Sequence, residues 1–200
     1  MIDRRRFLTG GLSLAAWAGA SGRALPQADD WPSRLVAAAK RQIGETVFYD
    51  PAYVRLDFPG GDVPRERGVC TDVIVRAYRD GLGVDLQQRV NADMRQAFAR
   101  YPGQWGLTAP DSNIDHRRVP NLQTFFRRAG AELGPGGDYR PGDVVSHLLP
   151  GNLAHISIVA DAAGADGRTP MIIHNIGAGA QLEDRLLEFE ITGHFRFSGA

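Results

Sequence analysis

The spacing of hydrophobic and polar positions along the chain changes near Pro141. Before it, apolar residues recur every three or four positions, which is the period of a helix that buries one face. After it, short apolar or alternating runs are separated by turn residues, which is typical of strands. Helices followed by strands predict an α+β domain in which N-terminal helices pack on a C-terminal antiparallel sheet.

The same patterns predict the individual elements. We expect helices over residues 31–43, 68–82, 84–100 and 121–131, the last of them capped by Asn121. We expect strands over residues 143–149, 154–160, 171–176, 186–191 and 194–197. Residues 45–67 read as extended segments and turns, and residues 101–120 as a long loop rich in proline, glycine and polar side chains. A loop of this length in a compact domain is usually functional or mobile.

The N-terminus carries an export pattern. The stretch Arg4-Arg5-Arg6-Phe7-Leu8 fits the twin-arginine motif, and an apolar run rich in glycine and alanine continues to Ala20. Basic residues, apolar run and small residues in this order predict a twin-arginine signal peptide over residues 1–28 and a single domain over residues 29–200. We therefore expect a periplasmic or exported protein with no stable membrane span after signal cleavage. The alternatives are a retained anchor and an ordinary basic N-terminus followed by a buried helix.

The charge balance excludes some classes of partner. Without residues 1–24, which hold four arginines and one aspartate, the chain has 19 basic and 22 acidic residues and a net charge of −3. This balance argues against a general binder of nucleic acid or of anionic membranes. The length suffices for one domain with its own core, and no internal repeat or low-complexity tract is present.

Cys70 is the single cysteine of the chain. One thiol cannot form an intramolecular disulfide, even in an oxidising compartment. The readings that remain are a buried inert thiol, an intermolecular bridge, a metal ligand and a nucleophile. Its position in the first turn of a predicted helix favours the nucleophile, because the helix dipole and the unpaired N–H groups there lower a thiol pKa and can stabilise an oxyanion.

A thiol nucleophile needs a base and a third group that orients the base. His155 lies in the predicted strand 154–160, and His174 lies in the next one, 171–176. Neighbouring antiparallel strands would bring the two imidazoles within reach of each other. Taken singly, each histidine could also be a core or edge residue with its own polar partner. Together with a lone thiol at a helix start, they favour a catalytic set of Cys70, His155 and His174.

The order of these motifs resembles the NlpC-type papain-like cysteine peptidases of bacterial cell-wall metabolism. The resemblance rests on Cys70 at a helix start, Gly142-Asp143 before a strand, His155-Ile156-Ser157-Ile158 on a strand and Ile172-Ile173-His174 on the next. More narrowly, the stretches GVCTDV, NIDHRRVPNL, AHISIVAD and IIHNIG are similar to an uncharacterised bacterial family of that superfamily, a domain of unknown function, over roughly residues 32–198.

The resemblance implies a papain-like fold and a hydrolase that needs no cofactor, with peptidoglycan or another peptide as its substrate. Cys70 would be the nucleophile, His155 the base and His174 the orienting residue. Asn175 is an alternative orienting residue, because papain-like enzymes use an asparagine in that role. The sequence departs from the peptidases at Val69-Cys70-Thr71-Asp72, where they carry Asp-Cys-Ser-Gly. The residue that helps those enzymes bind a free substrate amine is therefore missing.

Four further residues are candidates for substrate binding. Arg117 and Arg118 lie in the long loop and could clamp the carboxylates that peptidoglycan stem peptides carry. The alternative, which we favour, is that they form salt bridges that fold the loop onto the body of the domain. Trp105 could form the wall of a cleft, although such aromatics also serve in cores. Asp72 could contact substrate or pair with Arg76, four residues further along the helix.

These patterns leave several functions open. The first is a periplasmic cysteine hydrolase, an amidase or endopeptidase, that acts on peptidoglycan. The second is a zinc hydrolase with Cys70, His155 and His174 as ligands, although Cys70 lacks a local CxxC or HExxH companion. The third is a non-catalytic module that binds the cell wall or a partner on the same fold. An acyl transferase would share the thiol step of the first.

Overall fold

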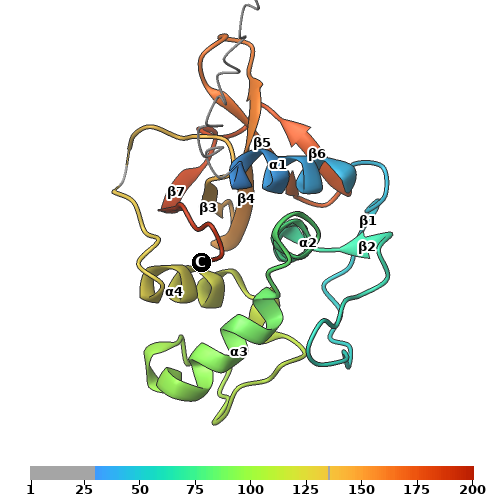
Figure 1. Cartoon of the computed structure of the whole chain (residues 1–200), viewed down its shortest axis with the longest axis vertical. Helices are drawn as coiled ribbons and strands as arrows, with labels where there is room; N and C mark the ends of the chain where they lie inside the picture. Colours follow the sequence, from blue (N-terminus) through green and yellow to red (C-terminus); the bar gives the residue numbers. More distant parts are fainter. Residues whose placement is uncertain (1–29, 135) are drawn as a thin grey trace, which may run out of the picture.

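The computed structural model describes residues 30–134 and 136–200. In these ranges the helices are α1 (Trp31–Arg41), α2 (Cys70–Leu82), α3 (Leu86–Ala97) and α4 (Val119–Arg128), with 3-10 turns η1 (Phe98–Arg100) and η2 (Asp115–Arg117). The strands are β1 (Phe48–Tyr49), β2 (Arg67–Gly68), β3 (Val144–Leu149), β4 (Leu153–Ala163), β5 (Pro170–Asn175), β6 (Ala180–Glu183) and β7 (Glu190–Phe195). The helices precede the main sheet and pack on it, so the predicted α+β class is confirmed (Figure 1).

The main sheet has five antiparallel strands in the order β6-β5-β4-β3-β7. The long strand β4 lies in its centre and pairs with β3 and β5. The last strand, β7, returns to the edge beside β3. A separate two-residue parallel pair joins β1 to β2 immediately before α2. The sheet therefore places β4, β5 and β6 side by side, and the candidate site uses all three.

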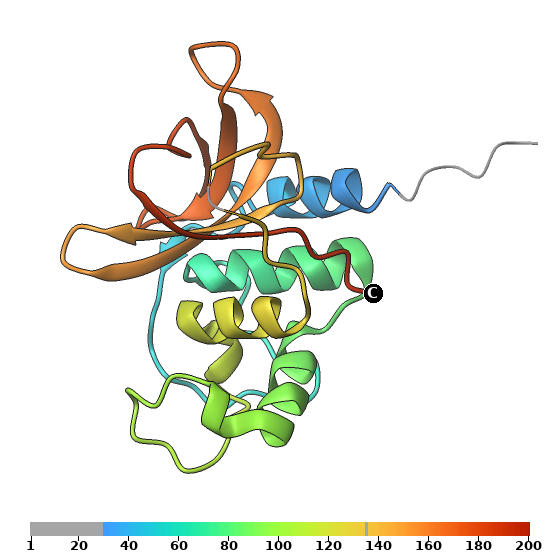
Figure 2. The same ribbon diagram turned by 90° about the vertical axis from the view of Figure 1, so that its left-hand side faces the viewer.

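Helix α2 is the buried centre of the domain. Figures 1 and 2 show it between α1 on one side and α3 and α4 on the other, next to the sheet. All of its residues from Cys70 to Tyr78 are buried, as expected for a helix that is covered on every side. Ile156 and Ile158 of β4 belong to the same apolar core as α2. This packing fixes Cys70, the first residue of the helix, against the centre of the sheet.

The two faces of β4 are both covered. Ile156 and Ile158 belong to the core that the helices form, whereas Val159 packs in a smaller apolar cluster around Leu186 on the opposite face. Alternation along the strand places His155 on the same face as Val159. His155 is consequently buried, with 3% of its surface exposed. A buried imidazole needs a polar partner, and the neighbouring strand supplies it.

The start of α4 differs from the prediction. The helix begins at Val119 with Pro120 in its first turn and Arg118 as the N-cap, because the fixed φ of proline suits a helix start. Asn121 does not cap the helix. Its buried side-chain amide instead donates to the carbonyl of Asp115 at 3.1 Å, so it ties the end of the long loop to the helix.

The C-terminal strands also differ from the prediction. A short strand, β6, lies at Ala180–Glu183, where none was expected, and one strand, β7, replaces the two expected over residues 186–191 and 194–197. Leu186 is buried between these strands as the centre of the second apolar cluster. Leu186 therefore anchors a loop, its neighbour Leu187 is exposed, and the two do not form a strand.

The predicted signal peptide over residues 1–28 lies outside the described residues. Among the residues that the structure does describe, no helix has the length and apolar character needed to cross a membrane. Export through the twin-arginine pathway remains a prediction from the sequence.

Candidate active site

Cys70 is the first residue of α2 and lines a cleft of about 300 Å³. Val69 before it has an extended backbone. Asp72 accepts a hydrogen bond from the Val69 N–H at 2.7 Å, which fixes the first turn of the helix. The rest of the cleft wall comes from the segment at β1, the long loop and the β3–β4 turn, and includes Tyr49, Trp105, Ile114, Arg118, Asn152 and Leu153.

The Cys70 thiol is nearly buried, with 5% of the residue exposed. Burial raises the pKa of Cys70 to about 12, and the charge of Asp72 adds to the rise. Hydrogen bonds from the backbone of Ile156, Thr71 and Cys70 itself act in the opposite direction. The prediction of a lowered thiol pKa is therefore wrong for the resting protein. The helix start supplies N–H groups as expected, but desolvation outweighs them, and the resting thiol is protonated.

The two neighbours of His155 on β4 lie near Cys70, although no hydrogen bond joins the Cys70 sulfur to the His155 ring in the part of the chain that the structure describes. Ala154, which precedes it on β4, lines the same cleft as Cys70. Ile156, which follows it, hydrogen-bonds to the Cys70 sulfur through its backbone. The first turn of α2 thus abuts the strand segment that carries the predicted base.

His155 and His174 touch across β4 and β5, as the sequence predicts. Nε2 of His155 lies 2.8 Å from Nδ1 of His174. Nε2 of His174 in turn lies 2.7 Å from Oε2 of Glu183 on β6. Three neighbouring strands therefore supply a hydrogen-bonded chain of two imidazoles and one carboxylate, and both histidines are buried.

The carboxylate at the end of this chain fixes the tautomers. An ionised carboxylate only accepts hydrogen bonds, so Nε2–H of His174 donates to Glu183. The remaining nitrogen of a neutral His174, Nδ1, then accepts from Nε2–H of His155, which leaves Nδ1 of His155 without a proton. Burial lowers the pKa of His155 to about 3, and the charges of His174 and His147 add to the decrease. His155 is therefore neutral and presents a bare nitrogen, which is the state that a general base requires.

Asn175 does not take the orienting role that was left open for it. Its side-chain amide donates to the carbonyl of Gly68 at 3.0 Å, and its oxygen accepts from the N–H of Gly177 at 3.1 Å. His174 is the residue that contacts His155. Asn175 instead ties the end of β5 to the segment directly before Cys70.

Arg117 and Asp72 form a buried, two-point ion pair. Nε and Nη2 of Arg117 each lie 2.9 Å from one oxygen of Asp72. Arg117 also donates to the carbonyls of Asp50 and Ala52, and its own carbonyl accepts from the Thr71 hydroxyl. This geometry favours the salt-bridge interpretation of the long loop. The substrate-binding roles predicted for Arg117 and Asp72 gain no support, because each side chain is occupied by the other.

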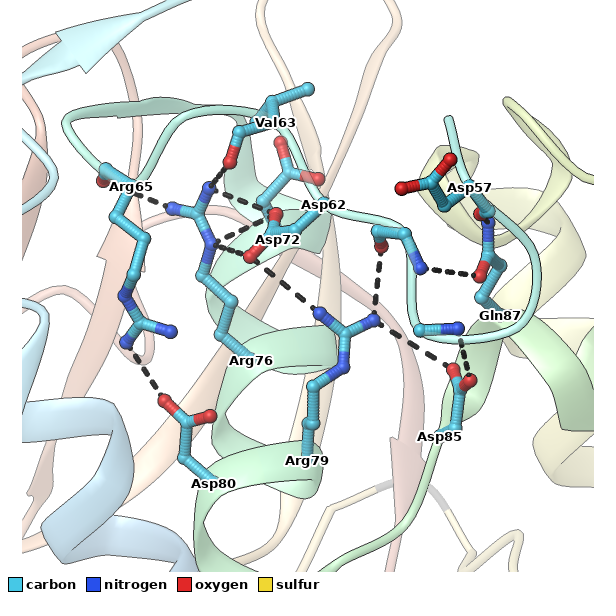
Figure 3. A network of polar contacts seen from close by, with 12 residues as sticks. Asp57, Asp62, Val63, Arg65, Asp72, Arg76, Arg79, Asp80, Asp85 and Gln87 are labelled. Carbon is cyan, nitrogen blue, oxygen red and sulfur yellow. Dashed lines mark hydrogen bonds and ion pairs between the residues drawn. The ribbon is translucent and has the colours of Figure 1, made fainter. Parts of the chain in front are cut away.

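Arg76 pairs with Asp62, and the predicted pair of Arg76 with Asp72 is wrong. Nε of the fully buried Arg76 lies 2.9 Å from Oδ2 of Asp62, and Nη2 donates to the carbonyl of Val63 (Figure 3). Nη2 also donates to the carbonyl of Arg67. The Arg76 guanidinium therefore bonds to several residues of the irregular segment that leads into α2 and holds that segment together. A buried arginine with its donors satisfied in this way is a structural residue.

Arg118 and Trp105 remain candidates for substrate binding. The Arg118 guanidinium lies over the Trp105 ring, 4.1 Å from its centroid, and Nη1 donates to Asp115 at 3.1 Å. Both side chains line the cleft that contains Cys70. Stacking on an aromatic face is a frequent way to hold a guanidinium in place.

The described residues offer no set of three histidine, cysteine, aspartate or glutamate side chains arranged to hold a metal ion. The two histidines turn their facing nitrogens toward each other, at 2.8 Å, and not toward a common point with Cys70. The zinc alternative therefore lacks a ligand set in this part of the chain.

Comparison with known proteins assigns this protein to a family. Residues 36–197 match the family described as Domain of unknown function (DUF1287). The chain belongs to this family. It is also 56% identical to the uncharacterized protein YijF of Escherichia coli (strain K12) over 166 residues, which cover 82% of this chain and 80% of YijF. The DUF1287 match spans Cys70, both histidines and Glu183, so the whole candidate site lies within the family domain.

The carboxylate that completes the chain, Glu183, is the site residue that the sequence did not reveal. We expect Glu183→Gln to lower turnover on the order of tenfold to a hundredfold, because a neutral amide no longer dictates the tautomer of His174. The imidazole ¹⁵N spectrum should change as well, with loss of the single Nε2–H tautomer at His155. Glu45→Gln is the matched control, because Glu45 is a glutamate whose ion pair, with Arg65, is exposed. An unchanged spectrum and rate in Glu183→Gln would remove Glu183 from the site.

Proposed function

We propose that this DUF1287 protein is an exported cysteine hydrolase, an amidase or endopeptidase, that acts on the peptides of peptidoglycan. The observation that carries the proposal is the hydrogen-bonded series from Glu183 through His174 to His155 on β4, because the next residue of that strand, Ile156, hydrogen-bonds through its backbone to Cys70 at the wall of a cleft. The order of a cysteine helix followed by two histidine strands also supports placement in the NlpC-type papain-like superfamily. The predicted export signal supports a cell-wall substrate.

The reaction would begin with a neutral thiol and a neutral imidazole. Cys70 sulfur attacks the amide carbonyl carbon while the thiol proton passes to Nδ1 of His155. The tetrahedral oxyanion forms at the N-terminal end of α2, where N–H groups and the helix dipole favour negative charge. His155 then protonates the leaving amine, which leaves an acyl thioester on Cys70. Water, deprotonated by His155, releases the acid and restores the thiol. Transfer of the acyl group to another amine or hydroxyl would share the first half of this reaction.

The non-catalytic alternative draws on one observation. Cys70 is almost buried and burial raises its pKa, as is usual for an inert core cysteine. The hydrogen-bonded histidines favour the hydrolase, because a cell-wall binding module has no need of a buried series of hydrogen bonds that fixes one tautomer of His155.

Product analysis would test the proposal directly. We expect the purified protein to release defined fragments from peptidoglycan, as read by mass spectrometry, in the presence of EDTA. Cys70→Ala should release none. Arg127→Ala is a suitable control, because Arg127 is exposed and pairs with Glu132 away from the cleft. Equal products from wild type and Cys70→Ala would refute the cysteine hydrolase.

The raised thiol pKa predicts a distinctive alkylation profile. With the thiol protonated at rest, the rate of Cys70 alkylation by iodoacetamide should rise about tenfold per pH unit from pH 6 to pH 9, in proportion to the thiolate fraction. A preformed thiolate–imidazolium pair would instead give a plateau that extends below pH 6. The measurement is mass-spectrometric quantification of modified Cys70 over time, and a plateau would contradict the neutral resting pair.

A further inference from the structure

The charged side chains that line the cleft are all arginines. Arg117 and Arg118 line it, and none of its described lining residues is an aspartate or glutamate. The carboxylates of Asp72 and Asp115 pair with these arginines and are themselves 4% and 2% exposed in their side chains. A ligand in the cleft therefore meets guanidinium groups, with the balancing carboxylates buried behind them.

Arg118 has more donors to spare than Arg117: of the five N–H groups of a guanidinium, Arg117 uses four in hydrogen bonds and Arg118 uses one. Arg117 directs its guanidinium to Asp72 and to two backbone carbonyls. Arg118 donates one hydrogen bond to Asp115 through Nη1, and its side chain remains 16% exposed at the cleft. The Trp105 ring holds the guanidinium plane in place. Such a plane is pre-organised for two-point contact with a carboxylate.

We propose that Arg118, stacked on Trp105, forms a carboxylate subsite beside Cys70, so that the enzyme selects peptides with a free carboxylate near the scissile amide. The proposal rests on the proposed function, since it takes the cleft as the place where the peptide binds. Val69, the residue before Cys70, supports it. It lines the cleft with an apolar side chain, so a substrate ammonium would find no carboxylate there and would lose its hydration without compensation.

Binding to an inactive variant tests the subsite independently of turnover. In Cys70→Ala protein, isothermal titration should show that N-acetyl-L-alanyl-D-glutamate binds about tenfold or more tightly than its diamide, because a hydrogen-bonded ion pair is lost with the amide. Equal affinity of the acid and the diamide would overturn the proposal. Failure of the hydrolase proposal would show elsewhere, as absence of product from the wild-type protein, and would leave this comparison intact.

Two variants, each made in the Cys70→Ala background, assign the preference to Arg118. Arg118→Ala should abolish the difference between acid and diamide, whereas Arg118→Lys should keep part of it, because a lysine retains the charge and the pair with Asp115 but not the planar fork. Arg127→Ala is the matched control, since Arg127 is an exposed arginine that pairs with Glu132 away from the cleft. A preference for the acid that survives in a folded Arg118→Ala protein would overturn the assignment. If Arg118→Ala fails to fold, a full acid preference in Arg118→Lys would overturn it as well.

Discussion

Alanine at position 70 is expected to reduce amide hydrolysis to the uncatalysed background. Without the sulfur no acyl-enzyme forms, and His155 has no thiol proton to accept. Cys70→Ser is expected to be almost as inactive, because an alcohol is a weaker acid and a poorer nucleophile than a thiol, and one imidazole activates it poorly in a site shaped for sulfur. Single-turnover release of peptidoglycan fragments, followed by mass spectrometry, measures both losses.

Combining this variant with a change at the base identifies the two residues as one unit. His155→Ala alone should cost on the order of 10²–10⁴-fold in turnover. The double variant of Cys70 and His155 should be no slower than Cys70→Ala, because residues that act in one step do not lose rate additively. Losses that multiply in the double variant would mean that the histidine acts outside the thiol step.

The Cys70→Ala variant should remain folded. Cys70 belongs to the apolar core, so replacing its sulfur with hydrogen leaves a small cavity and should cost on the order of 1 kcal/mol. Thermal unfolding of Cys70→Ala would separate loss of chemistry from loss of fold.

Periodicity in the sequence was enough to predict the architecture. The helical spacing around the cysteine and the alternation in the histidine strands correspond to α2, β4 and β5. The contact between His155 and His174 followed from their places on neighbouring strands. Glu183 did not follow, because β6 has only four residues and no long alternating pattern. Its carboxylate reaches His174 diagonally, from a position opposite Ile172, and that depends on the strand register.

The electrostatics of Cys70 could not be read from local sequence. Position at a helix start correctly predicts nearby N–H groups, but the sign of a pKa shift depends on how much water the fold removes. The packing of α2 between α1 and α4 and against β4 is a tertiary property. Burial consequently raises the pKa of Cys70 by more than the N–H groups at the helix start lower it. Asp72 shows the same limit, because helical spacing pairs it with Arg76 whereas the fold pairs it with Arg117.

Removing the charge of Arg117 is expected to destabilise the domain strongly. Arg117→Ala would leave the buried carboxylate of Asp72 unpaired and would free the loop from the carbonyls of Asp50 and Ala52. Breaking a buried ion pair from one side typically costs about 3–5 kcal/mol. For a domain of this size that corresponds to a decrease in melting temperature of roughly 6–20 °C, measurable by differential scanning calorimetry.

A second change separates the ion pair from the other contacts of the loop. The double variant Arg117→Met with Asp72→Asn should recover part of the lost stability, because no buried charge remains uncompensated and the introduced amide oxygen can still accept from the Val69 N–H. Arg127→Ala, which breaks an exposed pair with Glu132, should change the free energy of unfolding by less than about 0.5 kcal/mol. If Arg117→Ala melts like this control while substrate affinity falls, Arg117 serves the substrate and not the fold, and the salt-bridge interpretation of the loop is wrong.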